Sequence, residues 1–136
     1  MNHGANIQYD ERHDVDIEQL ARLRASTGWT DVSHDVLTKQ VHGAMWVVSA
    51  WDGPRLVGFA RAISDGVTNA YIATVVVDPE YRRRGIGSTI IQRLVSGRDE
   101  VRWVLRAEPG VAAFYTKLGF EPAHDMLRRD RQGHQG

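Results

Sequence analysis

Cysteine is absent from this chain of 136 residues, which excludes disulfide bonds, zinc–thiolate sites and a cysteine nucleophile. No apolar run approaches the roughly 20 residues that a membrane-spanning helix needs. An excess of positive charge is also lacking, because Lys+Arg and Asp+Glu each number 17, whereas nucleic-acid-binding domains are typically basic. We therefore expect neither a nucleic acid nor a membrane as a partner.

The sequence has no recognisable signal peptide and no internal repeat, so it predicts a cytoplasmic protein built as one unit. A chain of this length suits one domain with its own hydrophobic core. We expect this domain to span residues 1–129, and we expect the polar residues 130–136 to form a disordered tail.

Apolar spacing and turn residues predict an α/β chain in which helices and strands alternate. Ser33 is the expected N-cap of the second helix, and turns are expected at Asp52-Gly53 and Asp65-Gly66. The predicted helices are 15–26, 33–41, one that opens at 85–87 and continues to 95, and a short one that starts near 109 or 110. The predicted strands are 7–9, 45–50, 55–63, 69–77, 101–106, 119–121 and 126–129.

Residues 75–88, VVVDPEYRRRGIGS, carry the strongest functional signal in the chain. They read as the end of a strand, an Asp-Pro turn, three arginines and a Gly-Ile-Gly sequence that opens a helix. The first N–H groups of a helix have no partner within it, and the macrodipole is positive there. Glycines let a phosphate approach that backbone, and neighbouring arginines add positive charge. The segment therefore predicts a site for a phosphorylated ligand; the alternative is an ordinary basic turn between strand and helix.

Two better-known phosphate loops do not fit this segment. A P-loop has Gly-Lys-Ser/Thr at the helix start, whereas Gly87 is followed directly by Ser88. A dinucleotide-binding loop has glycine or alanine three residues after its second glycine, and that position is Ile90. The observed spacing is instead Arg82-x-x-Gly85-x-Gly87.

This loop and a second segment at 114–120, FYTKLGF, resemble the GCN5-related N-acetyltransferase (GNAT) superfamily. The predicted order of elements resembles that fold over nearly the whole chain. The resemblance implies a mixed, mostly antiparallel central sheet flanked by helices, with an acetyl-CoA loop between strand 4 and helix 3. It also implies an acetyl-CoA-dependent acyltransferase that needs no metal. Since family members are often dimers, it is compatible with a homodimer.

The resemblance also implies roles for particular residues. The strand at 75–77 would supply the N–H donor for the thioester oxyanion and hydrogen bonds to pantetheine. Tyr115 would donate a proton to the departing thiolate, which suits its reference pKa of about 10; a core aromatic residue is the alternative. The expected cofactor-binding residues are Val75, Val76, Val77, Arg82, Arg83, Arg84, Gly85, Ile86, Gly87, Ser88 and, in the CoA channel, Phe114.

The stretch at 56–66, LVGFARAISDG, points to one subgroup of this superfamily. It looks like a GNAT subgroup containing plastid enzymes that act on arylalkylamines such as serotonin and on protein amino groups. The subgroup implies a primary amine as acceptor without fixing which amine. Trp29, Trp46 and Trp51 are candidates for an aromatic wall around it, although simple packing is the commoner use of tryptophan.

Position 74 departs from the pattern of close relatives, which often carry Asp or Glu there as a base or an anchor for the amine. The residue here is Thr74, whose hydroxyl is no useful base at neutral pH but can hold a water that relays the proton. Thr74 and Tyr115 are therefore the candidate catalytic residues. Asp65, Glu108 and His42 are other candidates for the base, each with a structural role as the alternative. If Thr74 marks a loss of catalysis, the chain would instead be an acyl-CoA-binding regulatory module.

Overall fold

The computed structural model describes residues 6–29 and 32–132 of the chain. It divides into two compact units, residues 1–106 and residues 107–136. The part of the expected tail at 133–136 lies outside the described residues.

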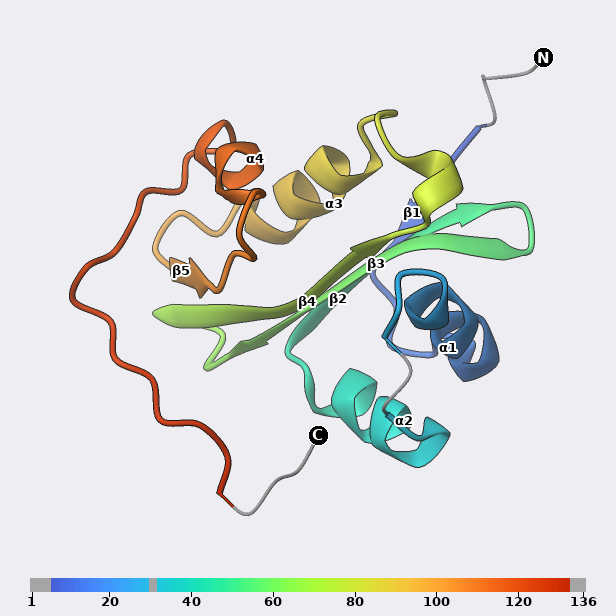
Figure 1. The fold of residues 1–136 in the computed structure, drawn as a ribbon, viewed down its shortest axis with the longest axis horizontal. Helices are drawn as coiled ribbons and strands as arrows, with labels where there is room; N and C mark the ends of the chain where they lie inside the picture. The colour runs from blue at the N-terminus through green and yellow to red at the C-terminus, as the bar shows by residue number, and fades with distance from the viewer. Residues whose placement is uncertain (1–5, 30–31, 133–136) are drawn as a thin grey trace. The chain divides into compact units, whose positions relative to one another are not determined.

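The first unit is built on a five-stranded sheet (Figure 1). The strands follow one another in chain order across the sheet, and every neighbouring pair is antiparallel except β4 and β5, which are parallel. The α/β class and the mixed, mostly antiparallel sheet are as predicted. The strands are β1 Gln8–Asp10, β2 Trp46–Asp52, β3 Arg55–Ser64, β4 Asn69–Val77 and β5 Arg102–Leu105.

Two helices, α1 Ile17–Ala25 and α2 His34–Gly43, cover one face of this sheet (Figure 1). Each begins at a side-chain cap, because Asp16 accepts from the N–H of Gln19 and Ser33 accepts from the N–H of Val36. The predicted cap at Ser33 is confirmed. The core on this face joins both helices to three strands and consists of Leu20, Leu23, Leu37, Val41, Ala44, Val47, Leu56, Phe59 and Val76.

Helix α3, Ile86–Val95, covers the opposite face (Figure 1). Its four buried residues, Ile86, Ile90, Ile91 and Leu94, recur at helical spacing. Gly58 of β3 lets this helix approach closely, because a Cβ there would lie 2.8 Å from Ile90 Cδ1 and 2.9 Å from Ile86 Cγ2. The close approach fixes the start of α3, and with it the loop at 82–85, against the sheet.

A bulge in β4 places the buried residues before it and the buried residues after it on opposite faces of the sheet. Arg61 pairs with Thr74 but Ala62 pairs with Ile72, so Ala73 is the extra residue. Val76 lies in the α1/α2 core, and Thr74, two residues away, shares that face. Ile72 pairs with Ala62 and therefore lies on the α3 side, the side to which Gly58 belongs.

The turn between β2 and β3 lies one residue later than predicted. Asp52 pairs with Arg55, which leaves Gly53 and Pro54 as the two-residue loop in place of Asp52-Gly53. The physical reason is glycine: Gly53 has a φ of 58°, which it adopts readily as the first central residue of a hairpin turn.

The second unit contains one short helix, α4 Ala112–Thr116. A Schellman motif ends it: the N–H of Phe120 bonds to the carbonyl of Tyr115, the N–H of Gly119 bonds to that of Thr116, and Gly119 has a φ of 99°. The predicted glycine cap is thus confirmed.

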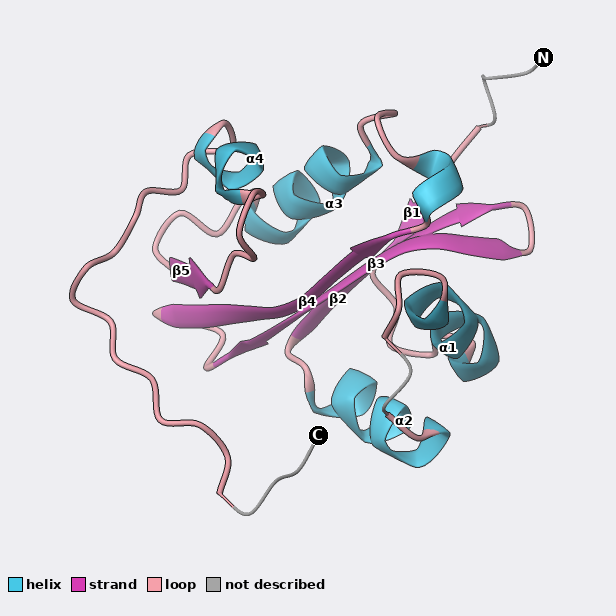
Figure 2. Ribbon diagram, viewed as in Figure 1, coloured by secondary structure: helices cyan, strands magenta, loops and turns pink. Residues whose placement is uncertain are grey.

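The predicted strands at 119–121 and 126–129 are wrong. Figure 2 draws the described chain after α4 as loop, without a strand. A strand exists by pairing, and Pro122 lacks the N–H that pairing uses. Leu127 is 98% exposed, so nothing packs on the segment to favour an extended pair.

Among residues 6–29 and 32–132, no helix combines the length and the apolar character needed to cross a membrane.

Candidate functional site

The loop between β4 and α3 presents a row of backbone N–H groups that have no acceptor among the described residues. The structure gives the N–H groups of residues 82–88 no hydrogen-bond partner among the described residues, and the first amide of this region with one is Thr89, which bonds to the Gly85 carbonyl at 3.0 Å. Arg83 has a φ of 65° and Gly85 a φ of 81°. These two left-handed residues shape a backbone concavity of the kind that binds anions.

The three arginines of the loop are exposed. The Arg84 side chain makes two contacts within the loop. Its guanidinium lies 4.8 Å from the centroid of the Tyr81 ring, and it donates a hydrogen bond to the Glu80 carbonyl at 3.2 Å. The Tyr81 hydroxyl in turn donates to Asp52. Arg82 and Arg83 have no side-chain hydrogen bond within the described part of the chain, so two positive charges remain available beside the open N–H groups.

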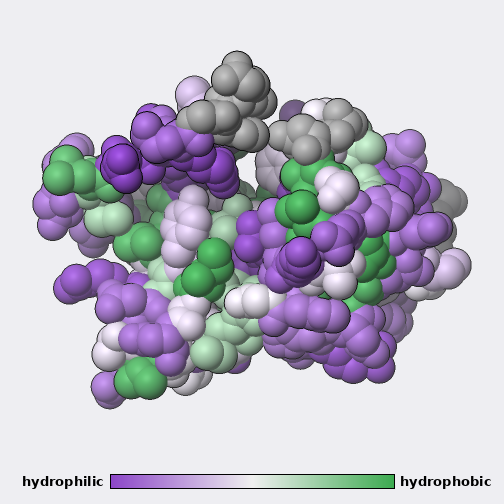
Figure 3. All heavy atoms as spheres, turned by 90° about the horizontal axis from the view of Figure 1, so that it is seen from below, coloured by the Kyte–Doolittle hydropathy of each residue, from purple (hydrophilic) through white to green (hydrophobic). Residues whose placement is uncertain are grey.

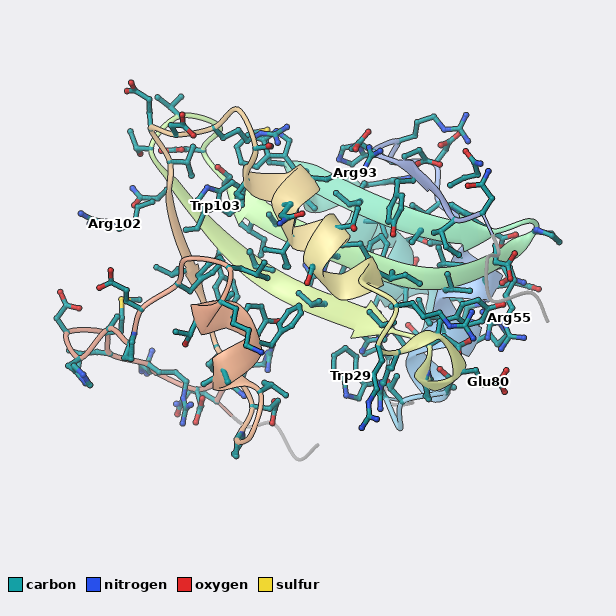
Figure 4. The ribbon with its side chains drawn as sticks, turned by 90° about the horizontal axis from the view of Figure 1, so that it is seen from above. Trp29, Arg55, Glu80, Arg93, Arg102 and Trp103 are labelled. Carbon is teal, nitrogen blue, oxygen red and sulfur yellow. The ribbon has the colours of Figure 1, made fainter. Side chains whose placement is uncertain are left out.

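Asp78 anchors the start of the loop and was not singled out from the sequence. Its side chain is 2% exposed and accepts from Arg55 Nη2 at 2.9 Å, from Arg22 Nη1 at 3.5 Å and from the N–H of Glu80 at 2.9 Å. Burial raises the pKa of Asp78, but the hydrogen bonds from Glu80 and Arg55 and the positive charge outweigh it, so the net shift is downward. Figure 4 shows Arg55 and Glu80 at the same end of the sheet.

The edge of β4 next to this loop is unpaired. β5 pairs with β4 only over Asn69–Ile72, so within the described residues no strand covers residues 73–77 on that side. The N–H of Asp78 bonds to the Val57 carbonyl of β3 at 2.8 Å. Because antiparallel pairs alternate, the backbone groups of Val75 and Val77 then point away from β3, toward the unpaired edge.

Thr74 lies within this uncovered stretch of β4, and its hydroxyl is already engaged. It is 6% exposed, and its Oγ1 accepts from Arg61 Nε of β3 at 2.9 Å. The hydroxyl keeps its own proton to donate, for example to a water. Burial, and next the charge of Arg24, lower the pKa of Arg61.

The remaining predicted site residues, Phe114 and Tyr115, lie in α4 of the second unit. Their rings meet edge to face with centroids 4.9 Å apart, and Tyr115 meets Phe120 at 5.8 Å. Burial raises the pKa of Tyr115, so its phenol stays protonated at neutral pH and can act as a proton donor.

Among the other candidates for the base, the structure gives a local role to Asp65. Asp65 accepts from the N–H groups of Val67 and Thr68, both at 2.8 Å, and from the Thr68 hydroxyl. These bonds lower the pKa of Asp65, which makes it a turn residue and a poor base. His42 and Glu108 are exposed.

The three tryptophans do not form one wall. Trp46 meets Trp103 at 5.5 Å and lies under Arg98 at 4.1 Å, whereas Trp51 packs against the α1/α2 core. Only Trp29, 38% exposed, is an exposed surface residue among them.

Within the described residues, no three side chains of His, Cys, Asp or Glu lie together as a metal site requires.

Sequence reasoning missed Asp78, Arg55 and Arg61 as parts of the site. A polar residue at the end of a valine-rich strand was the available signal for Asp78, but its arginine partners lie 23 and 56 residues away in the sequence. Arg61 is recognisable only from the register of β3 against β4.

Comparison with known proteins agrees with this geometry. The sequence model of the acetyltransferase (GNAT) family matches residues 15–120. The chain is 31% identical over 122 residues to the uncharacterized N-acetyltransferase ycf52 of Pyropia yezoensis, covering 85% of this chain and 70% of that protein. It is 43% identical over 77 residues to serotonin N-acetyltransferase 2, chloroplastic, of Oryza sativa subsp. japonica, covering 54% of this chain but only 38% of that protein.

Solved structures share the fold. The GNAT family acetyltransferase SP0256 of Streptococcus pneumoniae TIGR4 superposes with a TM-score of 0.79 at 25% identity, covering 93% of this chain and 99% of that one. The aminoglycoside N-acetyltransferase AAC(6')-Iy, solved in complex with CoA, superposes with a TM-score of 0.72 at 17% identity, covering 97% and 99%. At 17% identity, the similarity to the aminoglycoside N-acetyltransferase is evidence for the fold alone. The chain therefore belongs to the acetyltransferase (GNAT) family, whose members are acyltransferases with acetyl-CoA as cosubstrate.

Proposed function

We propose that this protein transfers an acetyl group from acetyl-CoA to a primary amine by direct attack. The observation that carries the proposal is the row of N–H groups without acceptors at residues 82–88, placed beside the unpaired edge of β4. The loop offers an anion site for a diphosphate, and the edge offers hydrogen bonds to an extended ligand that adds to a sheet.

Different parts of the loop and strand would hold different parts of acetyl-CoA. The backbone at 83–88 would hold the diphosphate, with Arg82, Arg83 and Arg84 adding charge. Val75 and Val77 would bond to the pantetheine through their backbone groups, while Val76 packs below them in the core. Phe114 would line the channel.

The reaction needs a neutral amine, a stabilised oxyanion and a proton for the leaving group. The amine nitrogen forms a bond to the thioester carbonyl carbon, the carbon–sulfur bond breaks, and the amine proton passes to solvent. A backbone N–H of β4 donates to the oxyanion. Tyr115 gives its proton to the thiolate and recovers one from solvent, and Thr74 holds the water that receives the amine proton. The approach of Tyr115 to the thioester is itself part of the proposal.

The acceptor class follows from the relatives and is proposed on that ground alone. A relative is named a serotonin N-acetyltransferase, which favours a small arylalkylamine or similar amine; a protein amino group is the other member of the class. Acetyltransferase names among the relatives favour catalysis over the regulatory module. We also propose that residues 1–129 act as one domain, in the cytoplasm, although that relative is named chloroplastic, and that the protein can form a homodimer.

The first test is the thermal midpoint with and without saturating acetyl-CoA. At a hundredfold excess over its dissociation constant, a ligand specific to the folded state adds about 2.7 kcal/mol, which raises the midpoint of a domain of this size by roughly ten degrees. Gly85→Glu should abolish the rise, because the carboxylate repels the diphosphate.

Gly97→Glu is the matched control for that variant. Gly97, just beyond the other end of α3, has a φ of 77°, and like Gly85 it has no atom within 4 Å of a built Cβ. It therefore adds the same charge and the same backbone strain away from the loop. Absence of any rise in the wild-type protein at millimolar acetyl-CoA would contradict the proposal.

Turnover is tested by release of the CoA thiol with a panel of primary amines. Tyr115→Phe should lower kcat by roughly 100-fold or more while leaving the midpoint rise with acetyl-CoA in place. Equal kcat values in the two proteins would remove Tyr115 from the mechanism.

A further inference from the structure

Arg61 is a half-buried cation that has no acidic partner in the described part of the chain. Its only hydrogen bond within the described part of the chain runs from Nε to the neutral hydroxyl of Thr74 at 2.9 Å. No carboxylate among the described residues forms an ion pair with it. A guanidinium has five N–H donors and keeps its charge at every physiological pH, so four donors and a full charge stay available.

Asp78, a fully buried charge, is neutralised in this structure. Asp78 has two arginine partners, with Nη–Oδ2 distances of 2.9 and 3.5 Å. Burying a charge without a partner costs free energy, so the half-buried Arg61, which has no such partner among the described residues, would gain from an anionic ligand.

Arg61 lies beside the place where the proposed reaction occurs. It pairs with Thr74 across β3 and β4, and Thr74 lies within the stretch of β4, residues 73–77, that β5 does not cover. Its side chain is on the face covered by α1 and α2, because Phe59, two residues earlier in β3, belongs to the core there. The α3 helix, which begins at the proposed diphosphate site, covers the other face.

Within residues 6–29 and 32–132, the groups that act on Arg61 add no negative charge. From α1 comes Arg24, whose charge, after burial, is the second cause that lowers the pKa of Arg61. β4 contributes the hydroxyl of Thr74 and the phenol of Tyr71. Among the described residues, the groups that act on Arg61 are therefore positive or neutral.

Apolar surface continues from Arg61 along the same face. Ile63 is 48% exposed and its cross-strand partner Tyr71 is 40% exposed. Figure 3, the view from the side on which α1 and α2 lie, shows hydrophobic surface exposed among hydrophilic areas. An acceptor whose anionic group lies on Arg61 would place its remainder against this apolar surface.

We propose that Arg61 binds the carboxylate of the acceptor, and that the acceptor is an α-amino acid with an apolar or aromatic side chain. The planar guanidinium matches a carboxylate through two parallel N–H···O bonds, and in an α-amino acid the carboxylate is one carbon from the attacking nitrogen. Polyamines and other purely cationic acceptors are repelled by the same charge. This inference rests on the proposed acetyl transfer and names its substrate class.

The experiment compares matched acceptors that differ only in the carboxylate: L-tyrosine against tyramine, and L-phenylalanine against phenethylamine. The readout is kcat/KM from release of the CoA thiol by the full chain at fixed saturating acetyl-CoA. We expect the amino acid to exceed its amine by roughly 10- to 100-fold, as a charge-assisted contact predicts, with most of the difference in KM.

Two variants separate recognition from folding. Arg61→Gln should reduce the amino acid/amine ratio to about one or below, mainly by raising KM for the amino acid, and Arg61→Lys should recover part of it because the charge remains. Thr74→Asp should reduce the ratio by supplying Arg61 with an internal carboxylate. Arg102→Gln is the matched control; Arg102 is an exposed arginine on β5 that points away from the sheet in Figure 4, and its substitution should leave the ratio unchanged.

The outcomes distinguish this inference from the proposed function. No midpoint rise with acetyl-CoA overturns both. Three results would overturn the role of Arg61 while a midpoint rise leaves acetyl-CoA binding standing. They are turnover of the amines alone, equal kcat/KM for the amino acid and the amine of each pair, and no turnover of any of the four acceptors. A carboxylate preference that persists in Arg61→Gln with the midpoint rise intact also overturns it.

Discussion

Replacing Asp78 with asparagine tests whether one buried carboxylate holds the phosphate loop. Asp78→Asn keeps the size of the side chain and one acceptor oxygen, but removes the charge that faces Arg55 and Arg22. Hydrogen bonds to charged groups are each worth about 1.5–3 kcal/mol. The two arginine side chains are 42% and 37% exposed, so water compensates part of the loss. We expect a destabilisation of about 2 kcal/mol, or roughly 6–10 °C in the thermal midpoint.

The matched control is Asp35→Asn. Asp35 pairs with Lys39 at 3.3 Å on the surface of α2, with both side chains 77% exposed, and such a pair contributes about 0.5 kcal/mol or less. Urea denaturation of the three proteins at pH 7 gives the differences. If Asp78→Asn cost no more than Asp35→Asn, the anchoring role of Asp78 would be refuted.

The pH dependence gives a second check on Asp78. The pKa of Asp78 in the folded protein is below its ordinary value of 3.8, so its ion pairs stabilise the folded state fully above about pH 4. This stabilisation is lost as the pH falls through the lowered pKa. The difference between the wild-type protein and Asp78→Asn should therefore shrink below pH 3.8; a difference that grew on acidification would contradict the argument.

Three further predictions concern α3, the loop and the proton donor. Gly58→Ala should destabilise by about 1–3 kcal/mol and weaken the midpoint rise with acetyl-CoA, because its Cβ meets Ile90 and Ile86; Gly43→Ala, with open space at its Cβ, should do neither. Arg83→Gly should stabilise by about 1 kcal/mol by relieving a φ of 65°, yet weaken acetyl-CoA binding in titration, whereas Arg83→Lys should leave the strain in place. Because burial raises the pKa of Tyr115 above 10, its deprotonation should lower kcat only above pH 10; an alkaline fall below pH 10 that disappears in Tyr115→Phe would contradict this.

Local signals in the sequence were enough for much of the fold. β4 has the predicted bounds, Asn69–Val77, because a turn on each side delimits a run of β-favouring residues. Ser33 caps α2 as predicted, because an N-cap depends on residues three apart. The Gly-Ile-Gly sequence likewise fixes the start of α3 at Ile86.

Features that depend on pairing could not be predicted. Whether Arg61 meets Thr74 depends on where β3 is bulged against β4, and a shift of one residue moves a side chain to the other face. The strands expected at 119–121 and 126–129 had suitable composition but no partner. The anchor at Asp78 depends on Arg55 of β3 at 2.9 Å and on Arg22 of α1 at 3.5 Å, and no spacing in the sequence indicates that either side chain reaches Asp78.

The bulge at Ala73 gives β4 an unequal tolerance of sequence change. Ala70, Ile72, Thr74 and Val76 alternate regularly with more exposed neighbours, yet the first two belong to one layer of the protein and the last two to the other. Because Ala73 is the extra residue, deleting it would leave Ile72 opposite Ala62 and Thr74 opposite Arg61, so both would keep their layers. Inserting or deleting a residue elsewhere in β4 would turn the residues on one side of the change out of their layers. For this strand we therefore expect a change of length to be tolerated at Ala73 and not at the other positions.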